Sequence, residues 1–330
     1  MLARVKIIGA GHAVGSIEVS NEDTSHRLGL RPNSLLKRTG IATRRVCADD
    51  ENGAVLASKA VGAALADASL TSKNLGSETL LLYIQNGMTH LTPPGGILLA
   101  RDAGIPKVRV ISLDGVCAEP IHAIEIGALM LSQHRCDRVI VCASADFNSI
   151  VDDNDEETAG LFGAGAGAIV LQRAPPSETG VIEGLSWKTD ASYWDLGTIE
   201  IIGQTRHAAG LSVDFGFYEM KGARLLRAGV GIIRQVVKQA LDEAGWEIGS
   251  IDHIVSHQPN PKMLEIGMNK VGLPFDRVSV PGSTLGNMGP ASVLIAFSIL
   301  RQNGALTAGQ RVLLLSFGLG FSCGCAALTI

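Results

Sequence analysis

The sequence predicts an α/β fold made of two similar halves. Short apolar runs rich in Val, Ile and Leu alternate with longer segments of helical periodicity, which is typical of helices covering a buried, parallel sheet. The same succession of motifs occurs twice along the chain. With 330 residues, 46% of them hydrophobic, the chain is long enough to bury a large core.

The elements of the first half follow in order. Residues 1–15 indicate a strand, a glycine turn and then polar chain. Residues 54–68 predict an amphipathic helix, and the apolar run 79–86 predicts a buried strand. A second helix is expected over residues 121–133, followed by strands at 138–141 and 168–171.

The second half repeats these signals in the same order. Residues 240–244 and 253–260 resemble 64–68 and 79–86, and a helix is expected over 225–244. Residues 287–302 and 311–314 resemble 117–133 and 138–141, and residues 317–320 and 326–329 resemble 162–165 and 168–171. The turn-rich segment 174–180 is the expected link, which divides the chain into residues 1–174 and 175–330.

This duplication draws attention to Cys117, His257 and Asn287. Cys117 and Asn287 begin equivalent helices, and His257 follows a predicted strand. If the halves pack about a pseudo-twofold axis, the three residues converge at its centre. A cysteine at a helix start suits a nucleophile, because unpaired N–H groups lower a thiol pKa from about 8.5 toward neutrality. The alternative interpretations are a small buried cysteine, a strand-end histidine and a helix-capping asparagine.

Composition and charge exclude several classes of protein. A net charge of −4 argues against a general nucleic-acid binder. The six cysteines lie in apolar surroundings without metal-ligand spacing, so we expect reduced thiols in a cytoplasm and no metal site. No targeting segment is evident, and glycines divide the uncharged stretch 312–330 into two expected strands, so no membrane span is predicted.

Neither glycine-rich segment predicts a nucleotide cofactor. The run 162–168 has no Lys-Ser or Lys-Thr and leads into a strand, so close backbone packing is the better interpretation. Gly9 and Gly11 do not complete a dinucleotide pattern, because Val14 stands at the third glycine position. We therefore expect no cofactor.

Several segments together resemble the β-ketoacyl-acyl carrier protein synthase III family of condensing enzymes, over nearly the whole chain. Each segment alone is a weak signal, but all occur in the family's order and at its typical intervals between the cysteine, histidine and asparagine. The matching segments are residues 38–41, 117–118, 162–168, 257–260, 286–292 and 317–322.

The resemblance implies a thiolase fold, in which duplicated α/β halves form five αβαβα layers. It implies that Cys117, His257 and Asn287 are catalytic, with Cys117 accepting an acyl group from a thioester. The backbone N–H groups of Cys117 and Leu319 would form the oxyanion hole. Neutral His257 and the Asn287 amide would then stabilise the enolate of a second thioester. The family also forms dimers, so a homodimer is expected.

Departures from the family pattern concern the substrates. Of the family's coenzyme A clamp only Arg38 remains, since Ser34 and Ser149 replace a tryptophan and an arginine. Both acyl groups are therefore expected on acyl carrier protein, whose acidic surface would dock on basic residues that match or adjoin the family's patch. Thr92 replaces a phenylalanine that limits acyl length, which favours medium or longer chains. The residues expected to dock the carrier protein are Lys221, Arg227, Lys262 and Lys270, and those expected to bind acyl substrate are Arg38, Thr92, Phe217 and Gly318.

Glu119, two residues after the expected nucleophile, is unusual for the family. It either complements the helix dipole or acts as a base in joining two preformed β-ketoacyl thioesters without decarboxylation, as in relatives that form pyrones or diones. The predicted function is an acyltransferase that forms a carbon–carbon bond by Claisen condensation, in polyketide or fatty-acid-derived biosynthesis. The alternatives are acyl transfer to a hydroxyl or amine acceptor, and a non-catalytic partner subunit of a condensing heterodimer.

Overall fold

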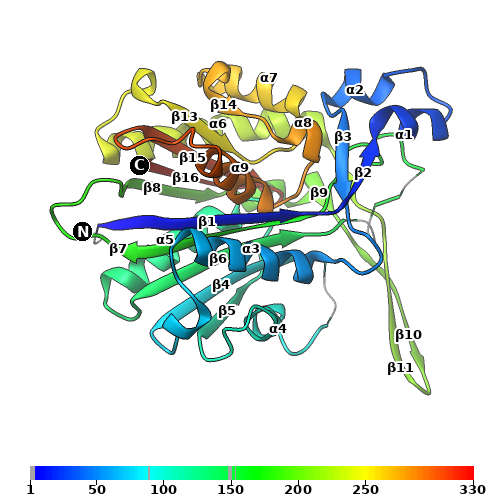
Figure 1. Cartoon of the computed structure of the whole chain (residues 1–330). Coiled ribbons are helices and arrows are strands. Elements are labelled where there is room, and N and C mark those ends of the chain that lie inside the picture. Colours follow the sequence, from blue (N-terminus) through cyan, green and yellow to red (C-terminus); the bar gives the residue numbers. More distant parts are fainter. Residues whose placement is uncertain (1–3, 88–89, 148–150, 153) are drawn as a thin grey trace.

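The computed structural model describes residues 4–87, 90–147, 151–152 and 154–330. Within these residues, two five-stranded sheets lie one above the other (Figure 1). The first sheet has the order β1-β7-β6-β4-β5, and the second has the order β14-β13-β15-β16-β8. Three short two-stranded pairs, β2–β3, β9–β12 and β10–β11, lie outside the sheets.

The first sheet and its helices come from residues 5–173. Its strands are β1 (Val5–Val14), β4 (Thr79–Asn86), β5 (Arg109–Leu113), β6 (Arg138–Ala145) and β7 (Gly165–Arg173). The short strands β2 (Ile17–Ser20) and β3 (Thr43–Val46) pair with each other and flank the first two helices. The helices are α1 (Asn21–Arg27), α2 (Ser34–Thr39), α3 (Gly53–Asp67), the 3₁₀ helix η1 (Ser72–Asn74), α4 (Gly95–Asp102) and α5 (Glu119–Ser132).

The second sheet and its helices come from residues 182–329. Its strands are β8 (Ile182–Thr189), β13 (His253–Ser256), β14 (Val278–Ser279), β15 (Arg311–Gly318) and β16 (Ser322–Thr329). The short strands are β9 (Gly197–Thr198), β10 (Ile201–His207), β11 (Gly210–Phe215) and β12 (Glu219–Met220). The helices are α6 (Gly222–Ala244), α7 (Pro261–Val271), α8 (Gly282–Leu285), α9 (Ala291–Gln302) and the 3₁₀ helices η2 (Ala191–Leu196), η3 (Ile248–Ser250) and η4 (Phe275–Arg277).

The two sheets have the same topology, which confirms the duplicated halves. Strands β5, β4 and β6 are mutually parallel, while β7 and β1 run antiparallel to their neighbours. Strands β14, β13 and β15 are likewise parallel, with β16 and β8 antiparallel. The expected parallel pairing was therefore right for three strands of each sheet and wrong for the other two. Tight connections such as the turn between β15 and β16 can join only antiparallel neighbours.

The helices complete the five layers. Helix α5 packs against β6 of the first sheet and β15 of the second, and α9 packs against β7 and β13 in the same central layer. Helix α3 covers the outer face of the first sheet, and α6 covers the outer face of the second (Figure 1). The central layer is the largest core, and its side chains come from both halves. The helices that begin near Cys117 and Asn287 are thus buried between the sheets.

Strand β1 corrects the predicted glycine turn, because Gly9 and Gly11 lie within one continuous strand. A Cβ at Gly9 would lie 2.4 Å from the carbonyl oxygen of Ala64, and one at Gly11 would lie 2.3 Å from the amide nitrogen of Ala64. Both residues therefore let α3 approach the sheet closely. The glycine-rich run behaves similarly, since a Cβ at Gly167 would lie 2.6 Å from Leu294 Cβ on α9. That run serves close packing, as predicted.

The hairpin β10–β11 projects away from the two sheets (Figure 1). Among the described residues, no helix combines the length and apolar character needed to span a membrane.

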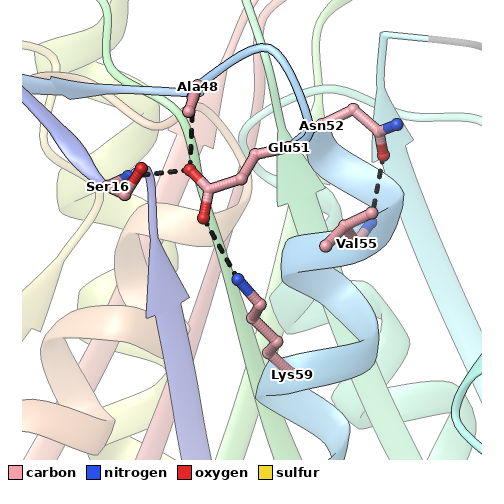
Figure 2. A network of polar contacts seen from close by, with 6 residues as sticks. All are labelled: Ser16, Ala48, Glu51, Asn52, Val55 and Lys59. Atoms are coloured by element: carbon pink, nitrogen blue, oxygen red, sulfur yellow. Dashed lines mark hydrogen bonds and ion pairs between the residues drawn. The ribbon is translucent and has the colours of Figure 1, made fainter.

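Glu51 holds the loop between β3 and α3 in place (Figure 2). Its carboxylate accepts hydrogen bonds from the backbone N–H groups of Ser16 at 2.8 Å and Ala48 at 3.3 Å, and from Lys59 Nζ at 3.1 Å. These bonds lower the pKa of Glu51 to about 2. The neighbouring Asn52 caps α3, where its Oδ1 accepts from the N–H groups of Ala54 and Val55. The carboxylate therefore joins the turn between β1 and β2, the loop before α3, and α3 itself.

We expect Glu51→Gln to destabilise the protein at neutral pH by about 2 kcal/mol, the usual contribution of hydrogen bonds to a charged group. Because folding lowers the pKa of Glu51, its stabilising effect is present above pH 4.5 and is lost as pH falls toward 2. Urea unfolding at pH 7 and pH 3 measures this, and the difference between variant and wild type should shrink at pH 3. Glu18→Gln is the control, because its exposed pair with Arg45 contributes little. Equal stability of Glu51→Gln and wild type at pH 7 would contradict the prediction.

Candidate active site

Cys117 lies in the turn between β5 and α5, just before the helix begins. The turn is closed by the Glu119 N–H, which donates to the Val116 carbonyl at 3.0 Å. The thiol is half-buried, and burial raises its pKa to about 12. The expected shift toward neutrality is therefore wrong for this structure, because desolvation of a thiolate outweighs the favourable N–H groups. At neutral pH the resting sulfur carries its proton.

Strand β15 of the second half approaches Cys117 closely. A Cβ at Gly318 would lie 3.0 Å from the Cys117 amide nitrogen and 3.1 Å from its Cβ, so only glycine fits without adjustment. Two residues earlier, the buried Ser316 hydroxyl donates to the Cys117 carbonyl oxygen. Leu319 follows Gly318, and its side chain lies against Gly197 of β9. Cys117 and Leu319, the two residues predicted to form the oxyanion hole, are thus brought together by the close contact between Gly318 and Cys117.

His257 is the first residue after β13. Its N–H donates to the Leu315 carbonyl of β15 at 2.8 Å, and its ring meets the edge of Phe317 with centroids 5.5 Å apart. Burial lowers the pKa of His257 to about 4, with the backbone of Gly289 opposing the shift. The ring is therefore neutral at pH 7. Among the described residues, its buried Nδ1 has no hydrogen-bond partner.

Asn287 lies between α8 and α9, where its backbone joins the first half. Its N–H donates to the Leu161 carbonyl at 2.8 Å, and its own carbonyl accepts from Gly163 at 3.0 Å. The side-chain Oδ1 accepts from the Gly289 N–H at 2.9 Å. Among the described residues the Nδ2 group makes no hydrogen bond, so it is the free donor end of the amide. Gly289 thus contacts both Asn287 and His257.

These contacts bring the three predicted residues into one region. Gly318 touches Cys117, the adjacent Phe317 touches His257, and Gly289 links His257 to Asn287. The arrangement combines a thiol, a neutral imidazole and an amide donor at the meeting point of both halves. It can form a covalent acyl thioester and then donate hydrogen bonds to an enolate oxygen.

Glu119 begins α5, and its carboxylate Oε1 lies 3.2 Å from His122 Nδ1. It also lies against Gly115, where a Cβ would be 2.2 Å from Oε2. His122 in turn stacks on Trp187, with ring centroids 4.6 Å apart. The carboxylate therefore has protein partners at the helix start, and a role as base stays a prediction.

The predicted acyl-binding residues are dispersed. Arg38 on α2 donates to the Glu156 carbonyl, and Thr92 is exposed ahead of α4. Phe217 is 60% exposed at the base of the β10–β11 hairpin, whereas Gly318 lies against Cys117. Ser149, where the resemblance suggested a lost arginine, lies outside the described residues.

The four basic residues predicted to dock a carrier protein are exposed on or just before α6 and α7, which pack against each other. One of them is already paired, since Lys221 Nζ lies 3.0 Å from Asp195 Oδ2. The other three are Arg227 on α6 and Lys262 and Lys270 on α7.

Two residues near the site were not predicted from the sequence. Tyr218 meets Phe162 edge to face with centroids 5.2 Å apart, and burial raises the pKa of its hydroxyl. Ser316 bonds the carbonyl of Cys117, although the two residues are 199 positions apart in the sequence. Neither residue belongs to a motif, although Ser316 directly precedes the matched segment 317–322. In the described part of the chain, no cluster of His, Cys, Asp or Glu could hold a metal ion.

Comparisons with known proteins agree with this site. Two family models match the chain. The model of 3-oxoacyl-[acyl-carrier-protein] synthase III matches residues 112–191, and the model of the C-terminal part of that enzyme matches residues 241–330. A β-ketoacyl-[acyl-carrier-protein] synthase III from Streptomyces coelicolor is 30% identical over 328 residues, covering 98% of this chain and 96% of the relative.

Solved structures extend the comparison. A priming β-ketosynthase of polyketide biosynthesis superposes with a TM-score of 0.88 at 25% identity, covering 100% of this chain and 98% of that one. OleA from Xanthomonas campestris, crystallised with lauric acid and lauroyl-CoA, shares the fold with a TM-score of 0.82 at 22% identity and 100% coverage of both chains. The chain belongs to the β-ketoacyl-[acyl-carrier-protein] synthase III family of thiolase-fold condensing enzymes.

Proposed function

We propose that this protein joins two acyl thioesters by Claisen condensation through an acyl intermediate on Cys117. The observation that carries the proposal is the contact between Cys117 and Gly318, with His257 and Asn287 linked to it through Phe317 and Gly289. A condensing role is favoured over acyl transfer to a hydroxyl or amine. The reason is that the free donor end of Asn287 suits an enolate oxygen.

In the first half-reaction, Cys117 Sγ attacks the carbonyl carbon of the first thioester. An S–C bond forms and the carbonyl electron pair moves to oxygen, which accepts hydrogen bonds from the N–H groups of Cys117 and Leu319. Collapse breaks the bond to the donor sulfur, which leaves with the proton lost by Cys117. The acyl group remains on Cys117.

In the second half-reaction, the other thioester becomes an enolate. It loses carbon dioxide from a malonyl group, or loses an α proton to a base, for which Glu119 is the candidate. Neutral His257 and Asn287 Nδ2 donate to the enolate oxygen. Its carbon attacks the acyl carbonyl, a C–C bond forms and the S–C bond breaks. The Cys117 thiolate then takes a proton from the base that removed the α proton or, after decarboxylation, from solvent.

The substrates we propose are medium or longer acyl chains on acyl carrier protein, in polyketide or fatty-acid-derived biosynthesis. Ser34 and Thr92 support this, because neither offers the aromatic surface expected for adenine or for a short acyl pocket. The exposed basic residues on α6 and α7 complement an acidic carrier surface. Pyrone or dione products from two β-ketoacyl chains remain part of this proposal.

We further infer a homodimer in the cytoplasm. Strand β5 is an edge strand, and its Ile111 and the nearby Ile97 of α4 are 39% and 48% exposed. An apolar sheet edge of this kind suits pairing with a second copy. The six cysteines, all within the described residues, are free thiols, in keeping with a reducing compartment.

Donor preference tests the proposal. We expect a dodecanoyl group to transfer to Cys117 at least about tenfold faster from acyl carrier protein than from coenzyme A, as followed by intact mass. Exchanging Lys262 and Lys270 for Glu should slow only the carrier-dependent transfer. Lys238→Glu is the control, since this exposed residue is paired with Asp242 farther along α6. Equal rates from both donors would contradict carrier recognition, and no acyl adduct from either would contradict the acyl-enzyme itself.

A further inference from the structure

The contact between Ser316 and Cys117 joins two distant parts of the chain. The Ser316 hydroxyl donates to the Cys117 carbonyl, although the two residues are 199 positions apart. Ser316 is fully buried and lies on the face of β15 that meets the start of α5 in the central layer. A buried hydroxyl aimed at one specific carbonyl fixes a geometry as well as satisfying a donor.

Two glycines bring β15 and β16 close enough for this contact. A Cβ at Gly318 would lie 3.0 Å from the Cys117 nitrogen, and one at Gly324 would lie 2.7 Å from Ile121 Cβ. Gly324 is the cross-strand partner of Ser316 in the β15–β16 pair. The same face of the hairpin therefore meets the start of α5 at Ser316, Gly318 and Gly324.

The second predicted oxyanion donor directly follows this strand. Leu319 is three residues after Ser316, so the Ser316 hydrogen bond to Cys117 lies close along the chain to the Leu319 N–H. Two donors stabilise one oxygen only if both lie about 2.7–3.1 Å from it. A small displacement of β15 would therefore weaken the hydrogen bonds of the oxyanion hole. Because the Ser316 hydroxyl bonds the Cys117 carbonyl, it restrains the distance between the backbone of Cys117 and strand β15.

We propose that Ser316 is a positioning residue that aligns the two halves of the oxyanion hole on either side of Cys117. It does not touch the substrate. This inference rests on the proposed acyl transfer to Cys117, but it adds a residue that the sequence motifs do not identify. It also explains why a polar side chain occupies a fully buried position among Leu and Val residues of β15.

Single-turnover acylation and alkylation separate positioning from simple stability. Iodoacetamide alkylates Cys117 without forming an oxyanion, whereas a thioester must form one. We expect Ser316→Ala to slow acylation at saturating dodecanoyl carrier protein by about tenfold, the effect of one hydrogen bond. Its alkylation rate should stay within about twofold of wild type, since the thiol is unchanged.

Ser186→Ala is the matched control, because this buried serine of the same sheet has no side-chain hydrogen bond among the described residues. It should leave both rates unchanged. Equal acylation by Ser316→Ala and wild type, or a parallel loss of both reactions, overturns the positioning role alone. Absence of any thioester-derived adduct on the wild-type protein overturns the proposed function and this inference together.

Discussion

Cys117→Ala should abolish the acyl-enzyme and lower condensation by at least about three orders of magnitude. The expectation follows from the position of the thiol, which lies against Gly318 and beside the backbone groups that would hold the oxyanion. Without sulfur there is no atom at this point that can accept the acyl group. Intact mass after incubation with dodecanoyl carrier protein, together with product formation, measures both effects.

Cys47→Ala is the control for this experiment. Cys47 is also half-buried, and burial likewise raises its pKa to about 12, but it lies at the entrance to α3 beside Asp146. Removing it should leave the adduct and the activity in place. An adduct of normal mass on Cys117→Ala would show that another residue carries the acyl group.

Asn287→Asp should separate the two half-reactions. The carboxylate keeps an oxygen that accepts from the Gly289 N–H, but it loses the amide donor and adds a negative charge. We expect condensation to fall by about 10²- to 10³-fold, the usual effect of losing one donor to a developing oxyanion. Acylation of Cys117 should change by only a few fold, because that step uses backbone donors.

The two half-reactions are measured on the same preparation, by intact mass and by product formation. Asn52→Asp serves as the control, because at the start of α3 an Asp accepts the same capping hydrogen bonds as the Asn. It should leave both steps unchanged. A proportional loss of acylation and condensation in Asn287→Asp would contradict a specific role in the enolate step.

Local patterns predicted most of the architecture. The repeated helix–strand signals identified α3, α5, α6 and α9 and the strands that follow them, because their periodicity and apolar runs are local properties. The pattern could not reveal strand direction, so β7 and β16 were not distinguished from parallel strands. The glycine turn predicted near Gly9 and Gly11 was wrong for a related reason. The contact that requires these glycines is made by Ala64 of α3, more than fifty residues away along the chain.

The sequence by itself determined the duplicated α/β fold, its family and the positions of Cys117, His257 and Asn287, because periodicity and motif order are written along the chain. Only the tertiary structure decided the environment of these groups. Packing between the halves desolvates Cys117, which raises its thiol pKa, and desolvates His257, which keeps its ring neutral. It also brings Ser316 to the Cys117 carbonyl, a contact that exists only because two distant backbones meet.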